Sequence, residues 1–275
     1  MKVKNLYNFI LHPKSYINNL AEKVAKEEIR KNGFIPINEH KDQDIFLVAF
    51  PKSGITWLQS LVAGLQYGID TEFLPDKLVQ EIVPDIYDKK YYKRFGDIKI
   101  FKSHELPQES YKRVIYLVRD GRDAMVSYLH FNHKWNINVT LEEMIKENKN
   151  VYPAPWWQHV KAWTENPYNS EILYIRYEDL LENTAKELKR ICEFIGIERD
   201  DELIKRIATG STFDKMKQKA KKYDGLGHSR WQGEKGQEFF RKGKSGTYKE
   251  EMPENLIEYF TEKAYQELKQ YGYEA

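Results

Sequence analysis

The chain has 275 residues, 41% of them hydrophobic and 14% aromatic, which is enough for a substantial core and argues against a disordered protein. Its formal net charge is only +2, so the overall charge favours no class of partner. The lone Cys192 excludes an internal disulfide framework and a multi-cysteine metal site. No stretch approaches the roughly 20 apolar residues of a transmembrane helix, and we expect a cytoplasmic protein.

Short apolar runs alternate with longer amphipathic stretches, which predicts a parallel sheet covered by helices. No repeat or linker divides the sequence, so we expect one α/β domain over residues 1–275, with a helical extension at residues 1–40. Strands are predicted at Ile45 to Phe50, Ile98 to Phe101, Val114 to Val118 and Ile172 to Arg176. Helices are predicted from Thr56 to Tyr67, from just after Gly121 through Ser127, and from Thr184 to Ile195. Ligands of such sheets bind at the carboxyl ends of the strands, where motifs distant in sequence meet.

The first motif, FPKSGITW at Phe50 to Trp57, joins a predicted strand to a predicted helix. Backbone N–H groups in a glycine-containing turn and at a helix N-terminus form an anion cradle. Lys52 adds a positive charge, and Ser53 and Thr56 add hydroxyl donors, so the motif suits a phosphate or a sulfate. The strand-loop-helix is P-loop-like but lacks GxxxxGK[ST]. Taken alone, an ordinary capped helix start remains the alternative.

The second motif is RDGRDAMVS, in which Arg119 follows a strand and Ser127 comes about two helical turns later. An arginine fork with a hydroxyl suits a phosphomonoester. The alternative is that Asp120 and Asp123 pair with the two arginines of the motif at the surface.

The third motif, FRKGKSGTYK at Phe240 to Lys249, ends a basic segment at residues 215–249. Eleven lysines and arginines against three acidic residues give this segment a net charge of +8, and six glycines punctuate it. Long segments of this kind in a compact domain are usually functional or mobile. We interpret it as a lid over a polyanion; a solvated surface loop is the alternative.

These motifs, in this order and spacing, resemble those of the cytosolic sulfotransferase family. PKSGITW is similar to the family's PKSGTTW, the Arg119–Ser127 spacing matches its 3′-phosphate motif, and RKGKSGTYK is similar to its RKGxxGDWK. Further similarity lies in KSHELP, WWQHVKAW, ILYIRYEDL and STFDKM, and the resemblance runs from about Ile45 to Glu258. It implies a single α/β domain with a central parallel sheet, and transfer of a sulfuryl group from 3′-phosphoadenosine 5′-phosphosulfate (PAPS) to a small acceptor.

The resemblance also assigns roles to individual positions. The phosphosulfate end falls to Lys52, Ser53, Gly54, Thr56 and Trp57. The adenine pocket falls to Trp57, Tyr177, Phe213 and Phe239, and the 3′-phosphate pocket to Arg119, Ser127, Arg241, Lys242 and Gly243. Ser211 and Thr212 lie near positions that contact the nucleotide, and His104, beside Lys102, stands where the family keeps its catalytic base.

Sulfuryl transfer is an in-line displacement like phosphoryl transfer. An imidazole has an ordinary pKa of about 6.5, so His104 suits the role of accepting the acceptor's proton. Lys52 would neutralise the leaving phosphate and Lys102 would assist at the transferred group, so no metal is expected. His130, His133 and His159 are interpreted as packing or pocket-wall residues.

Three departures from the family pattern stand out. Ile55 replaces a threonine, Thr247-Tyr248 replace Asp-Trp, and Pro253-Glu254 stand where the family's dimer motif has Thr-Val, so the oligomeric state is left open. We expect a small aromatic or apolar acceptor and no nucleic-acid partner. The alternatives are a nucleotide-dependent phosphotransferase and a polyanion- or nucleic-acid-binding protein.

Overall fold

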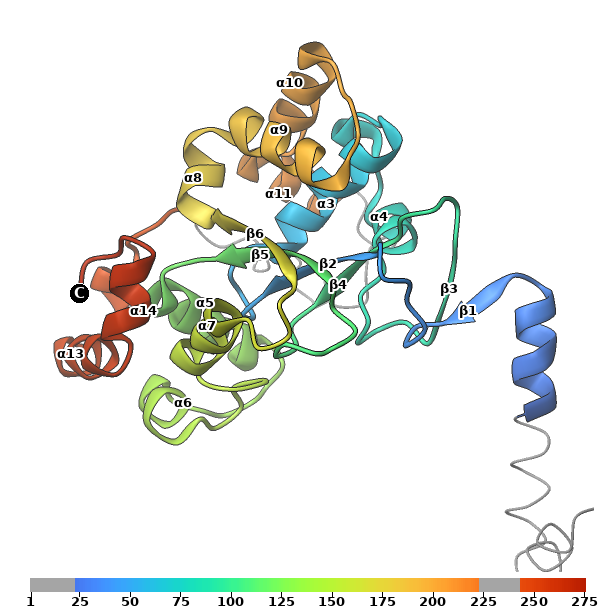
Figure 1. The fold of residues 1–275 in the computed structure, drawn as a ribbon. Helices are drawn as coiled ribbons and strands as arrows, with labels where there is room; N and C mark the ends of the chain where they lie inside the picture. Colours follow the sequence, from blue (N-terminus) through green and yellow to red (C-terminus); the bar gives the residue numbers. More distant parts are fainter. Residues whose placement is uncertain (1–22, 223–242) are drawn as a thin grey trace, which may run out of the picture.

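The computed structural model describes residues 23–222 and 243–275 (Figure 1). Its centre is a four-stranded parallel sheet in the order β4-β2-β5-β6. The strands are β4 (Ile100–Ser103), β2 (Ile45–Ala49), β5 (Arg113–Val118) and β6 (Glu171–Arg176). The central parallel sheet flanked by helices therefore confirms the predicted fold class.

Both faces of the sheet are covered, because every residue of β2 is buried and apolar. Ile45, Leu47 and Ala49 contribute to one core, and Phe46 and Val48 to the other. The first core lies beneath α3 (Ile55–Tyr67), α4 (Asp76–Ile82), α8 (Tyr177–Glu182), α9 (Thr184–Ile195) and α10 (Asp201–Gly210). The second lies beneath α5 (Gly121–Lys134), α6 (Leu141–Glu147), α7 (Trp156–Glu165), α13 (Glu254–Lys263) and α14 (Tyr265–Gln270). Figure 1 shows α3, α9 and α10 on one side of the sheet and α5, α6 and α7 on the other.

The predicted element boundaries differ from the observed ones at informative places. The helix expected at Thr184 to Ile195 has these bounds; the Asn183 side chain caps its first turn and Gly196 ends it in a left-handed conformation. Strand β4 starts two residues later than predicted and continues to Ser103, because it pairs with β2 up to Val48. This places Lys102 within the strand rather than in the loop after it.

The expected N-terminal helical extension is wrong in part. Within the expected N-terminal helical extension, residues 23–31 are helical, but β1 (Phe34–Pro36) is a strand that pairs antiparallel with β3 (Tyr91–Lys93). The remaining short elements are η1 (Thr71–Phe73), α11 (Phe213–Lys222) and α12 (Tyr248–Glu251). Within the described ranges, the helices are all too short or too polar to span a bilayer.

Candidate active site

The loop after β2 turns sharply before it enters α3. Lys52 and Gly54 both have positive φ, 69° and 97°, and Gly54 is the residue that precedes the helix. Glycine is required at position 54 for a second reason: a Cβ there would lie 2.7 Å from two ring carbons of Tyr177. The turn directs the first N–H groups of α3, which have no acceptor within the helix, toward the carboxyl edge of the sheet. Thr56 lies in this first turn.

Arg119 follows β5 directly and connects two loops. Its guanidinium donates to the carbonyl oxygens of Lys52 at 3.2 Å and of Lys244 at 3.1 Å. It also lies 4.6 Å from the ring centroid of Tyr177, the first residue of α8. Arg119, from the second motif, therefore links the loop of the first motif at Lys52 to the loop of the third motif at Lys244.

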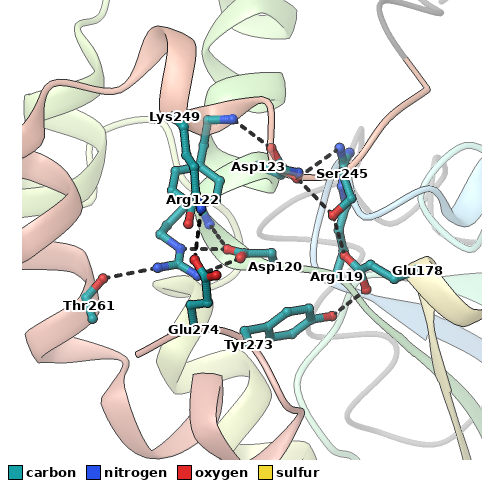
Figure 2. Close-up of polar contacts among 12 residues, drawn as sticks. Arg119, Asp120, Arg122, Asp123, Glu178, Ser245, Lys249, Thr261, Tyr273 and Glu274 are labelled. Atoms are coloured by element: carbon teal, nitrogen blue, oxygen red, sulfur yellow. Dashed lines mark hydrogen bonds and ion pairs between the residues drawn. The ribbon is translucent and has the colours of Figure 1, made fainter.

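Asp123, fully buried in the first turn of α5, fixes the end of the third motif (Figure 2). Its carboxylate accepts hydrogen bonds from the backbone N–H groups of Gly246 at 2.7 Å and Tyr248 at 2.9 Å, and from the Thr247 hydroxyl at 3.1 Å. The Tyr248 ring lies 4.4 Å from the guanidinium carbon of Arg122. Thr247 and Tyr248, the two residues that depart from the family's Asp-Trp, are thus buried and partnered.

The Arg–Asp pairs considered as an alternative do form, but they are not at the surface. Arg122 binds Asp120 through two hydrogen bonds of 3.0 and 2.7 Å, and both side chains are buried. Arg119 lies 3.7 Å from Asp123. Pairing and ligand binding are compatible here, because Asp123 uses most of its acceptor capacity on the loop of the third motif.

Several polar atoms of the predicted nucleotide site are buried without a hydrogen-bond partner in the described structure. They are Ser53 Oγ, Trp57 Nε1, Arg119 Nε and Ser211 Oγ. A buried donor left unsatisfied costs about 1–3 kcal/mol, and native structures retain few of them. The Trp57 and Tyr177 rings meet edge to face with centroids 5.9 Å apart, and the Tyr177 ring also contacts the Arg119 guanidinium.

His104 follows β4 and is held in one tautomer. Its Nδ1 lies 2.7 Å from the carbonyl oxygen of Ala49, which only accepts, so Nδ1 carries the hydrogen and Nε2 is left as the acceptor of the neutral ring. Behind it, His159 Nε2 donates to the His104 carbonyl at 3.1 Å, and the Tyr116 hydroxyl donates to His159 Nδ1 at 2.9 Å. Burial lowers the pKa of His159 to about 3, so His159 stays neutral and serves as a fixed support.

Lys102 is bound to an acidic residue that the sequence analysis did not single out. Its Nζ lies 3.0 Å from Asp85 Oδ2, and both side chains are buried. Burial alone would raise the pKa of Asp85, but the charges of Lys102 and His104 and the N–H of Tyr87 hold it below its ordinary value. Asp85 lies in a connecting segment after α4 that has no recognisable motif, so nothing in the sequence pointed to it.

The other predicted site residues are placed as follows. Ser127 lies half-buried in α5, Lys52 Nζ lies 4.7 Å from the Phe131 ring centroid, Ser211 ends α10, and Thr212 is exposed beside it. Gly243 begins the second described range, and Phe213 begins α11. Phe239, Arg241 and Lys242, with residues 223–242 of the predicted lid, lie outside the described residues.

Comparison with known proteins gives a consistent result. A family model for the sulfotransferase domain matches residues 42–272. Sulfotransferase 1B1 of Mus musculus is 32% identical over 196 residues, which span 64% of this chain and 66%, just under two thirds, of that protein. Sulfotransferase 1E1 of Mus musculus is 28% identical over 252 residues, 83% of this chain and 84% of the relative.

Solved structures share the fold. Mouse sulfotransferase SULT7A1 complexed with PAP has a TM-score of 0.61 and 25% identity, over 82% of this chain and 84% of that one. Retinol dehydratase in complex with androsterone and the inactive cofactor PAP has a TM-score of 0.63 at 20% identity, over 84% and 82% of the two chains, and is similar in fold alone. With a family model that covers most of its length, this chain belongs to the sulfotransferase family.

Proposed function

We propose that this protein transfers a sulfuryl group from PAPS to a hydroxyl or amine of a small acceptor, with His104 as the general base. The observation that carries the proposal is the convergence of chemistry at one edge of the sheet. The loop of Lys52 follows β2, and His104, Arg119 and Tyr177 come directly after β4, β5 and β6. The PAP in the complex of the similar mouse SULT7A1 supports the choice of donor.

The residues present fit a doubly phosphorylated adenosine. The unpartnered Ser53 Oγ, Arg119 Nε and Ser211 Oγ are donors, and phosphate oxygens are strong acceptors. Ser127, two turns into α5, adds another hydroxyl. The edge-to-face pair of Trp57 and Tyr177 offers an aromatic surface for an adenine ring. When bound, PAPS supplies an activated sulfuryl group on a phosphate leaving group.

The protein's own groups have distinct tasks. The Nε2 atom of His104 accepts the acceptor's proton, since Nδ1 is held on the Ala49 carbonyl. Lys52, half-buried beside Phe131, places a positive charge where negative charge develops on the leaving phosphate. Lys102 comes two residues before His104 on the same strand end and adds a second cation there.

The side chains around His104 suit a flat acceptor. The Tyr87 and Tyr152 rings meet edge to face at 5.1 Å, and the Tyr152 hydroxyl donates to Glu105, the residue after His104. Phe131 and Trp135 form a second aromatic pair at 6.4 Å. Aromatic rings of this kind favour a phenol or an apolar alcohol over a carbohydrate.

The test is an acceptor screen with radiolabelled PAPS against phenols, steroid-like alcohols, aliphatic alcohols and amines, followed by His104→Ala on the best acceptor. General-base catalysis is worth roughly a hundredfold or more, so we expect at least about that loss of transfer, with PAP affinity retained. The control is Lys146→Ala, which removes an exposed side chain bound to Glu142 on α6 and should leave transfer unchanged. Near-wild-type turnover of His104→Ala contradicts the role as base. Magnesium-dependent phosphate transfer from ATP by the wild type would instead support a phosphotransferase.

A further inference from the structure

We propose that Asp85 is a positioning residue of the transfer site: it holds the Lys102 ammonium in place and stabilises the imidazolium that forms when His104 takes the acceptor's proton. The inference rests on the proposed function and deepens it. It assigns a task to a buried carboxylate that neither the sequence motifs nor the family comparison singles out.

The Asp85 carboxylate is fixed on both sides. Oδ1 accepts the backbone N–H of Tyr87 at 2.9 Å, and Oδ2 lies 3.0 Å from Lys102 Nζ. The backbone around Asp85 is tied to β4 by a parallel bridge between Asp85 and Lys102. The Lys102 N–H donates to the Pro84 carbonyl at 2.9 Å, and the Ile86 N–H donates to the Lys102 carbonyl at 3.1 Å. The carboxylate therefore has one position relative to the strand end that carries His104.

Burial makes this charge effective. The Asp85 side chain is 1% exposed and that of Lys102 6%, so their charges act through a medium of lower dielectric than water. The low pKa of Asp85 keeps it negative at neutral pH, and the charge of His104 is among the causes of that low pKa. Because the interaction is mutual, the Asp85 carboxylate favours the protonated form of His104 to the same extent.

The titratable groups on the segments around His104 include Lys102 on β4, Asp85 and Tyr87 after α4, Lys52 after β2, His159 on α7, Glu105 next in sequence, and Tyr152, which binds Glu105. His159 is neutral, because burial lowers its pKa to about 3. The Glu105 carboxylate accepts the Tyr152 hydroxyl. The lysines oppose a positive charge on His104, whereas the carboxylates of Asp85 and Glu105 favour it. Of these two, Asp85 is the buried one and is tied to β4 through Lys102.

The chain offers a matched control at the other end of the sheet. Asp44 is fully buried and binds Arg94 through hydrogen bonds of 2.8 and 2.7 Å. It precedes β2, whereas Ala49, the residue that holds His104, ends that strand. Five residues of extended strand separate the two by roughly 16 Å. Asp44→Asn therefore breaks an equally buried ion pair without placing a charge change near His104.

The experiment combines two readouts on wild type, Asp85→Asn, Lys102→Met and Asp44→Asn. The first is an NMR titration of the imidazole nitrogens in the protein without nucleotide, with the His104 signals assigned by their loss in His104→Ala. The second is the pH dependence of kcat/KM for transfer to the best acceptor, with the PAP affinity of each variant measured alongside. Unfolding in urea reports the stability of each variant.

Loss of the Asp85 charge should move the His104 titration, and the acid limb of kcat/KM, to lower pH by about half a unit or more. We expect kcat to fall at least about tenfold with PAP affinity within about twofold, because a weaker base and a displaced Lys102 affect the proton transfer rather than nucleotide binding. Lys102→Met should move the His104 titration to higher pH, because it removes a positive charge and leaves the Asp85 carboxylate. Where Asp85→Asn does not fold, this variant reports whether the charges of the ion pair reach His104. Asp44→Asn should lower stability and leave the titration unmoved.

A His104 titration unchanged in both Asp85→Asn and Lys102→Met overturns the inference, as does an equal shift in Asp44→Asn. The titration needs no donor, so it is independent of the proposed function. A wild type that transfers no sulfuryl group overturns the proposed function even where the titration moves, and the two failures are thereby distinguished.

Discussion

At the scale of single residues, two buried serines differ in whether their hydroxyl groups have a hydrogen-bond partner, and this difference separates a proposed ligand-binding role from a structural one. Ser53 Oγ is buried without a partner in the described residues, whereas Ser170 Oγ is buried and donates to the Tyr111 carbonyl at 2.5 Å. A buried hydroxyl without a partner does not stabilise the fold and carries the cost of its desolvation, while one that bonds a carbonyl contributes about 1 kcal/mol.

We therefore expect Ser53→Ala to leave the free energy of unfolding unchanged or higher and to weaken PAP binding about five- to tenfold, the loss of one hydrogen bond. Ser170→Ala should do the reverse: lose about 1 kcal/mol of stability and keep its PAP affinity. Urea unfolding and calorimetric titration with PAP measure both. A Ser53→Ala variant that is less stable but binds PAP normally would argue for a structural hydroxyl.

At the scale of elements, the site depends on how the loop after β2 meets the start of α8. Gly54 has a positive φ, and a Cβ added to it would lie only 2.7 Å from the Tyr177 ring. Gly33 also has a positive φ, 79°, but a Cβ there would have nothing within 4 Å. Alanine at either position would therefore strain the backbone, but only alanine at position 54 would also collide with the Tyr177 ring.

Gly33→Ala should lower the free energy of unfolding by about 1 kcal/mol through its φ and leave PAP affinity intact. Gly54→Ala should lower stability further and weaken PAP binding at least about tenfold, because the loop or the Tyr177 ring must move. Equal behaviour of the two variants in unfolding and in PAP titration would mean that the close approach to Tyr177 has no part in the site.

The elements also show what the sequence could predict. Strand β2, helix α3 and Arg119 after β5 were predictable, because a buried strand that ends at a charged loop leaves a local pattern. Asp85 was not assigned a role, and Asp123 was considered only as a partner of the nearby arginines. Lys102 lies 17 residues from Asp85 and Gly246 lies 123 residues from Asp123, so only the packed fold brings these partners together. Strand β1 was missed for the same reason: three residues carry no periodicity, and its pairing with β3 is long-range.

At the scale of the whole molecule, the sheet order brings loops that are distant in sequence to neighbouring strand ends. Strand β2 lies between β4 and β5, so the loop of Lys52 lies between the strand ends of His104 and Arg119. Arg119 then bonds the Lys52 carbonyl directly. This arrangement predicts that one ligand contacts both cationic groups, with its 5′ end near Lys52 and its 3′-phosphate near Arg119 and Ser127.

The most direct test compares the affinities of PAP and adenosine 5′-phosphate, which lacks the 3′-phosphate, for the wild type and for Ser127→Ala by calorimetry. We predict that the wild type binds PAP at least about a hundredfold more tightly, since charge-assisted hydrogen bonds to a phosphate are each worth about 1.5–3 kcal/mol. Ser127→Ala should weaken PAP binding and leave adenosine 5′-phosphate binding unchanged. Equal affinities of the two nucleotides for the wild type would contradict a single site built from both strand ends.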